Sequence, residues 1–178
     1  MDGLRLVAMS TTQQEAWLRG PVAGFEPHVM PMVHALIQAR EDFERLAGEI
    51  AADQIWQRPG GAASIGFHIR HTGGALDRLL TYARDEVLSD AQKAAARSEQ
   101  EEGEPLPSLL SGLRAHIDRA LEQLRSTSAD QLTHERRVGR AGLPSTVLGL
   151  LFHAAEHSTR HAGQAITTAR ILAGTTTK

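Results

Sequence analysis

Four long segments of the chain repeat apolar residues at intervals of three and four, and this pattern constrains the fold more than any other feature. Such spacing places the apolar side chains along one side of an α-helix, where they can face a common core. The pattern predicts helices over residues 27–52, 63–88, 107–125 and 144–174. Four such helices, joined by connections of mixed length, predict an all-α fold built as a helical bundle.

The segments between these helices read as connections. Pro59, Gly60 and Gly61 would break any helix that continued past the first segment. We expect residues 89–107 to form a mobile connection, with or without some helix, and residues 126–143 to form a loop with or without a short extended piece. Pro144 is expected at the start of the last helix, where proline is tolerated.

The N-terminal residues predict an extension to the bundle. Over residues 11–20, TTQQEAWLRG, we expect a short helix in which Thr12 and Glu15 have capping-box spacing and Gly20 marks the end. The length of 178 residues suits a single domain, 1–178, in which residues 1–24 form this extension.

Composition excludes several classes of function. The chain has no cysteine, which rules out disulfides, cysteine zinc sites and a cysteine nucleophile. A net charge of −2 and the lack of a Lys/Arg-rich run argue against nucleic-acid binding. No stretch approaches the roughly 20 apolar residues of a membrane span, and no apolar segment of signal-peptide type is seen. A cytoplasmic protein with no membrane partner is therefore predicted.

Three histidines stand at steps of four in the segment HAAEHSTRHAGQ, residues 153–164. On a helix, His153, His157 and His161 form a stripe that borders the apolar face near Leu150. Two histidines at i and i+4 can hold one metal ion, whereas i and i+8 lie roughly 12 Å apart along the axis. A third ligand must therefore come from another helix.

The second predicted helix offers that ligand in GFHIRHTGG, where His68 and His71 are three residues apart. Either could complete a three-histidine site with an open coordination position, and the spacing alone does not choose between them. The alternative is that these histidines are structural. Gly73 and Gly74 likewise indicate either close helix packing or room for a ligand. The remaining histidines are expected to be exposed or hydrogen-bonded: His28, His34, His116 and His134.

The motif HSTRHAGQ is similar to the H-x-x-x-H-R-G-Q signature on the last long helix of the DinB/YfiT-like metalloprotein superfamily. The segment ASIGFHIRHTGGALDRLLTYA resembles the second helix of that family, and EAWLRGPVAGFEPHVMPMVHALIQAREDFERL resembles its opening segment. The resemblance covers most of the chain and is weakest across residues 89–143. It departs from the signature at Ala162, where the family usually has an arginine that is not a ligand.

This resemblance implies an up-and-down four-helix bundle that often forms a homodimer. It implies His71, His157 and His161 as the metal ligands, with His71 preferred over His68 because Asp77 then lies at the family's spacing. Three further residues are candidates to support the ligands from the second shell: His68, His153 and Gln164. Glu156 and Arg160 are expected to point away from the ligands.

A divalent metal on neutral histidines would act as a Lewis acid and activate water. The prediction is a metal-dependent hydrolase of a small-molecule substrate, acting through metal-bound water, with zinc or nickel ahead of iron and manganese. Thiol-dependent S-transfer or isomerisation is an alternative, and it would need a low-molecular-weight thiol because the chain has none. A second alternative is a non-catalytic metal-binding stress protein. A third is a bundle that only mediates association and whose histidines are structural. No catalytic side chain is assigned.

Overall fold

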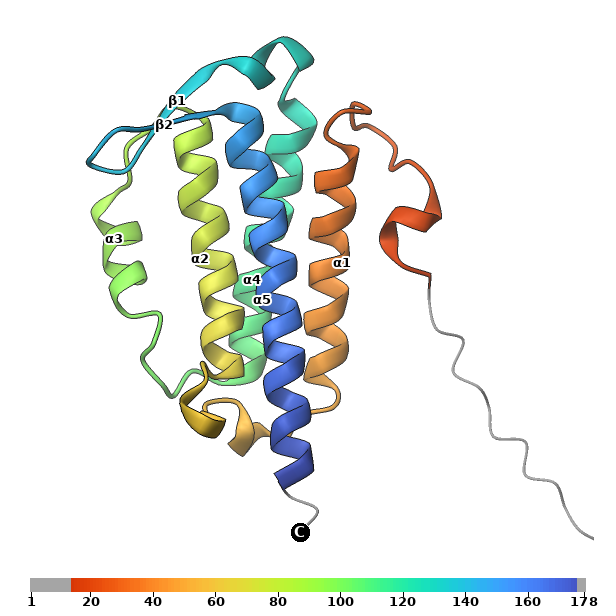
Figure 1. Ribbon diagram of the computed structural model, residues 1–178, viewed down its shortest axis with the longest axis vertical. Helices are drawn as coiled ribbons and strands as arrows, with labels where there is room; N and C mark the ends of the chain where they lie inside the picture. Colours follow the sequence, from red (N-terminus) through yellow and green to blue (C-terminus); the bar gives the residue numbers. More distant parts are fainter. Residues whose placement is uncertain (1–13, 176–178) are drawn as a thin grey trace, which may run out of the picture.

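The computed structural model describes residues 14–175 and shows a bundle of four long helices (Figure 1). The long helices are α1 (Met30–Ala47), α2 (Ile65–Ala83), α4 (Leu106–Ser126) and α5 (Val147–Thr175), with a short α3 at Asp90–Arg97. One small hairpin joins β1 (Glu135–Val138) to β2 (Leu143–Thr146). Short 3₁₀ turns occupy Ala16–Arg19, Ala52–Gln54, Pro59–Gly61 and Ala129–Thr133. The all-α four-helix-bundle prediction is confirmed.

The four long helices pack against one another in a definite arrangement. Each of α1 and α2 packs against both α4 and α5. The end of α4 meets the end of α2, where the Gln123 amide donates to the Leu80 carbonyl at 3.1 Å. At the other end, the indole of Trp56 donates to the Glu104 carbonyl at 3.1 Å. Helices α2 and α4 therefore run in the same direction, and the segment carrying α3 returns along the outside of α2 (Figure 1).

The apolar stripes predicted from the sequence form the core. Phe43 of α1 is fully buried, and burying a large apolar side chain stabilises a fold by about 1.5–3 kcal/mol. Because aromatic residues make up only 4% of the chain, aliphatic side chains fill most of the remaining space. The largest of these with almost no exposure are Leu36, Ile65, Ile69, Leu76, Ile117, Leu124 and Leu151.

The start of the last helix differs from the prediction. Pro144 lies in β2, opposite Arg137 of β1, and α5 begins only at Val147. A proline is compatible with a two-stranded ribbon because both strands are edge strands. The Thr146 hydroxyl accepts from the Gly149 amide at 3.0 Å, which satisfies a free backbone donor at the helix start. The expected extended piece in this connection is confirmed as the hairpin.

Other helix limits also differ from the prediction. Helix α1 ends at Ala47 rather than at residue 52, and residues 52–54 form a 3₁₀ turn instead. Ser64 caps α2 by accepting from the Phe67 amide at 3.1 Å. Near the N-terminus, the expected short helix is a 3₁₀ turn that ends at Gly20, whose φ is +85°. Thr12 lies outside the described residues. None of the helices described is long and apolar enough to span a membrane.

Candidate metal centre

Three histidines from the neighbouring helices α2 and α5 converge on one point. His71 of α2 and His157 and His161 of α5 each present a ring nitrogen, and these three atoms lie within 4.8 Å of one another. The Nε2 atoms of His71 and His157 are 2.9 Å apart. The ring centroids of His157 and His161 are separated by 4.4 Å, and those of His71 and His161 by 4.6 Å. The structure therefore brings together the three residues that the sequence nominated as ligands.

Their spacing fits a shared cation. Imidazole nitrogens bind divalent metals at about 2.0–2.1 Å, so two ligands at right angles have nitrogens about 2.9 Å apart. Two ring nitrogens at that separation either share a hydrogen atom or share a metal ion. All three side chains are half-buried, and neutral imidazole is a common ligand for divalent transition metals. The donor set thus suits a divalent metal without naming one.

His68 lies behind this cluster. The residue is 4% exposed, and its Nδ1 is 2.9 Å from the Nδ1 of His161. One of those two nitrogens must carry the hydrogen of that bond. If His161 presents its Nε2 to the cluster, its Nδ1–H donates to His68 and fixes the ring. His68 is accordingly placed to support His161, while His71 occupies the position among the three converging rings.

Glu99 supports His71, although no pattern in the sequence distinguishes it from the neighbouring glutamates. Its Oε2 is 2.6 Å from the Nδ1 of His71, and its Oε1 is 2.5 Å from the guanidinium of Arg78. The side chain of Glu99 is only 10% exposed. Burial by itself would raise the pKa of Glu99, but hydrogen bonds from His71 and Arg78 outweigh burial and hold that pKa below its usual value. An ionised carboxylate only accepts, so Nδ1 of His71 carries the hydrogen and Nε2 is free to bind a metal.

The two adjacent glycines of α2 allow this arrangement. A Cβ at position 74 would lie 2.5 Å from Oε1 of Glu99 and 2.9 Å from the Arg78 guanidinium. A Cβ at position 73 would lie 2.9 Å from the ring of His116 on α4. Both positions are therefore filled by neighbouring protein side chains. Close packing therefore accounts for the absence of a side chain at both positions, and Gly74 also lines an open groove with Glu99 and His116.

The other residues nominated from the sequence lie at the edge of the cluster. His153 bonds to Glu156 at 2.6 Å, and its ring centroid is 5.4 Å from that of His157. Gln164 is exposed, and within residues 14–175 no hydrogen bond joins it to the three histidines. Asp77 accepts from the Gln92 amide at 2.7 Å. Contrary to expectation, Arg160 reaches the cluster, with its guanidinium 3.3 Å from the Nδ1 of His157.

Two of the histidines set aside from the sequence have partners, as expected. His34 is 3.0 Å from the Gly20 carbonyl, and His116 is 2.8 Å from the Arg119 guanidinium.

Burial favours the neutral form of the His157 and His161 rings. Desolvation is the main cause that lowers the pKa of His157 to about 4 and that of His161 to about 3, and the charges of nearby rings lower them further. Desolvation and the neighbouring His71 also lower the pKa of His68 to about 4. Neutral imidazoles have the free lone pairs that a metal requires.

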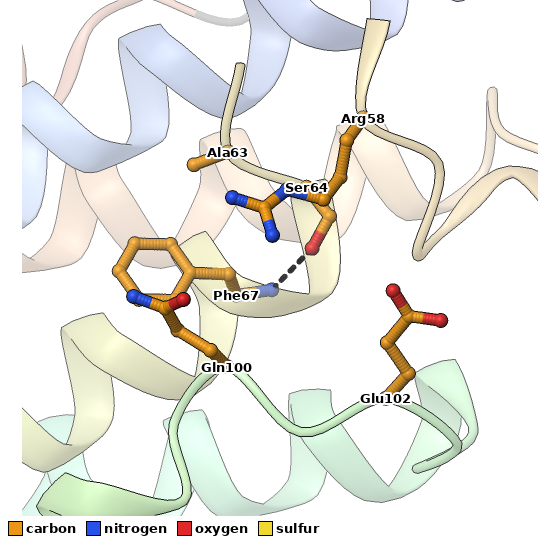
Figure 2. A pocket seen from close by; sticks show the side chains of 6 residues that line it. All are labelled: Arg58, Ala63, Ser64, Phe67, Gln100 and Glu102. Atoms are coloured by element: carbon orange, nitrogen blue, oxygen red, sulfur yellow. Dashed lines mark hydrogen bonds between the residues drawn. The ribbon is translucent and has the colours of Figure 1, made fainter. Parts of the chain in front are cut away.

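Phe67 forms the wall of the cluster on one side. Its ring stacks on His71 with centroids 5.1 Å apart and an interplanar angle of 15°. Figure 2 shows that Phe67 also lines a separate small pocket, together with Arg58, Ala63, Ser64, Gln100 and Glu102. No histidine of the cluster lines this pocket.

Comparison with known families identifies the chain's relatives. The sequence profile of the DinB superfamily matches residues 35–165. The chain belongs to the DinB superfamily. The match covers α2 and α5 as far as residue 165, and with them all three converging histidines. None of the curated proteins compared with the chain matches it.

Solved structures share the fold of this DinB superfamily member. A conserved protein from Enterococcus faecalis aligns with a TM-score of 0.68 at 17% identity, over 82% of this chain and 97% of that one. A DinB-like protein from Bacillus cereus aligns at 0.61 and 15% identity, over 80% and 91%. YfiT from Bacillus subtilis, described as a probable metal-dependent hydrolase with an unusual four-helix bundle topology, aligns at 0.63 and 12% identity, over 86% and 93%.

Proposed function

We propose that this DinB superfamily protein is a metal-dependent hydrolase of a small-molecule substrate, in which His71, His157 and His161 hold a divalent metal ion. The observation that carries the proposal is the convergence of three ring nitrogens within 4.8 Å from two helices that are far apart in sequence. The description of YfiT as a probable metal-dependent hydrolase supports it, although the likeness at 12% identity concerns the fold.

The chain's own residues would prepare the site in three ways. Neutral ligands leave the full charge of a bound divalent metal available, and such a metal supplies Lewis acidity and activates water. Glu99 and His68 orient the rings of His71 and His161 from behind. Three protein ligands leave coordination positions for substrate and water. Zinc and nickel are the metals we propose first, because imidazole ligands suit both.

Metal content tests the site directly. We expect protein purified without a histidine tag, then loaded and dialysed, to retain about one divalent metal per chain by elemental analysis. His157→Ala should lose the metal, because only His71 and His161 would remain as ligands. His153→Ala is the matched control, since it removes the same side chain one helical turn away and should keep the metal. Retention of a full equivalent by His157→Ala would refute the site.

Substrate turnover tests the reaction class. A panel of small esters and amides should be hydrolysed by the loaded protein in the absence of any thiol. Turnover that requires an added low-molecular-weight thiol would contradict a hydrolase and favour the predicted thiol-dependent transfer. A protein that keeps its metal but turns over nothing with or without an added thiol would favour the non-catalytic metal-binding alternative.

A further inference from the structure

A groove leads away from the histidine cluster between α2 and α5. Helix α2 contributes His71, Ala75, Arg78, Leu79 and Tyr82, which recur at steps of three and four and so share one side of the helix. The groove has a volume of about 380 Å³, within the usual range of small-molecule sites. From His71 to Tyr82 it follows α2 for about 16 Å.

Of the residues that the structure describes, only three outside α2 line the groove. His153 and His157 of α5 face α2 across the groove, and Leu88, in the connection before α3, closes part of it. His71 and His157 are the two cluster members that line it, so the groove meets the candidate metal centre at one end.

The two ends of the groove differ in chemistry. Around His71 and His157 it is polar, Leu79, Tyr82 and Leu88 add apolar surface farther along, and Arg78 and His153 lie between the two. The three apolar side chains are only partly buried although Leu79 and Tyr82 also pack on the core. Partly exposed apolar surface that adjoins a reactive centre marks a place where a ligand can remove it from water.

The polar side chains of Arg78 and His153 in the groove each have a carboxylate partner. Arg78 is 2.5 Å from Glu99, and His153 is 2.6 Å from Glu156. The carboxylate of Glu99 offsets the charge of Arg78 within the protein, so the lining residues that the structure describes present no unpaired charge that favours a charged ligand. The lining therefore matches a molecule with a polar reacting group at one end and an uncharged apolar body at the other.

We infer that the groove selects esters or amides whose acyl part is an apolar chain. The reacting carbonyl would lie at His71 and His157, and the chain would lie along α2 against Leu79, Tyr82 and Leu88. This inference rests on the proposed function, because the histidine cluster must hold a metal for the carbonyl to be placed there.

A series of straight-chain hydroxamates tests the inference by binding alone. The hydroxamate group ligates zinc, and the attached chain takes the place of the acyl part. Acetohydroxamate, butanohydroxamate, hexanohydroxamate and octanohydroxamate are titrated calorimetrically into the zinc-loaded protein, with elemental analysis showing that zinc stays bound. We expect affinity to rise by about two- to threefold per methylene, which is less than full burial would give because one side of the groove is open.

Two neighbouring residues give a matched pair of variants. Leu88 lines the groove, while Val87 beside it is 90% exposed and does not. Leu88→Ser should reduce the affinity for octanohydroxamate severalfold and leave that for acetohydroxamate unchanged. Val87→Ser should change neither. Because Leu88 lies outside the helices, its replacement is expected to leave the fold intact, and Leu79→Ala provides a second variant whose thermal unfolding is checked first.

The outcomes separate this inference from the proposed function. If acetohydroxamate binds the zinc protein and octanohydroxamate binds no tighter, the apolar groove is refuted and the metal site stands. If octanohydroxamate binds equally well to metal-free protein, the chain is not placed by the centre and the inference is also refuted. If zinc itself does not bind, the proposed function fails, and this inference fails with it.

Discussion

Glu99 shows how one residue outside the helices can determine the state of a ligand. It is buried between His71 and Arg78, where it fixes which nitrogen of His71 carries the hydrogen. We expect Glu99→Gln to weaken metal binding by about tenfold, at the lower end of the usual effect of removing such a partner, because glutamine keeps the hydrogen bond but not the charge. Competition with a chromophoric chelator measures this affinity.

Glu101→Gln is the control for that measurement. Its side chain is exposed, and its hydrogen bond to Arg70 is made by the backbone carbonyl, which the substitution keeps. Equal metal affinities in the two variants would show that the Glu99 carboxylate does not tune the site.

The same residue marks the limit of what the sequence predicts about the site. His157 and His161 are recognisable because helical spacing is a local property of the sequence, whereas the choice of His71 over His68 rests on the resemblance to the DinB/YfiT-like family. Glu99 stands in a segment with three more glutamates and no periodicity, at residues 99–104. Only the path of the chain back along α2 separates buried Glu99 from exposed Glu101 and Glu102. Asp77, nominated by spacing, bonds to Gln92 instead.

At the scale of elements, glycine has opposite roles in α2 and α4. A Cβ at Gly66 would lie 2.8 Å from three ring carbons of Trp56. That ring is held by a hydrogen bond to Glu104 and by the guanidinium of Arg70 at 4.7 Å. Gly66→Ala is therefore expected to lower the free energy of unfolding by about 1–3 kcal/mol through overpacking.

The same change in α4 should stabilise the protein. Gly112 is an exposed position within α4, and a Cβ there meets nothing within 4 Å. Gly112→Ala should raise the free energy of unfolding by up to about 1 kcal/mol through helix propensity. Urea denaturation of both variants measures the difference. A stabilised Gly66→Ala protein would mean that Trp56 can move aside at little cost.

The sequence predicts the long helices well because each has its own apolar stripe. It predicts the connections poorly because their structure depends on other elements. Pro144 is predicted at a helix start, but in the structure it lies in β2 because this segment pairs with β1. Helix α3 lacks any buried residue, although Ser89 and Gln92 form a capping box whose spacing is readable in the sequence. That local signal could have identified α3, whereas nothing local indicates that the chain then packs Glu99 against α2.

For the whole molecule, a metal at the histidine cluster would tie α2 to α5 across 86 residues of sequence. A ligand that binds only the folded state stabilises it by about 2.7 kcal/mol at a hundred times its dissociation constant. For a chain of this size that corresponds to a rise of about 5–10 °C in the midpoint of thermal unfolding. Zinc should raise the midpoint of the parent protein and of His153→Ala, and should leave His157→Ala unchanged. An equal rise in all three would locate the binding elsewhere.

Acidity should destabilise the metal-free molecule as a whole. The pKa values of His68, His157 and His161 are lowered in the folded state to about 4, 4 and 3, from an ordinary value near 6.5. Between those limits the unfolded chain binds protons that the folded chain does not, so the free energy of unfolding falls as the pH falls. The stability is fully present above about pH 6.5 and is lost progressively toward pH 4.

Thermal unfolding of metal-free protein between pH 7.5 and pH 4 measures this dependence. Below about pH 4.5 Glu99 acts in the same direction, since its pKa is also lowered and protonation removes its bonds to His71 and Arg78. His161→Gln removes the ring with the lowest of these pKa values and keeps a polar side chain of similar size. That variant should show a shallower loss of stability between pH 6.5 and pH 5 than the parent protein. Parallel curves would mean that the ring of His161 is protonated as readily in the folded bundle as in the unfolded chain, and that the cluster is more open to water than its packing between α2 and α5 indicates.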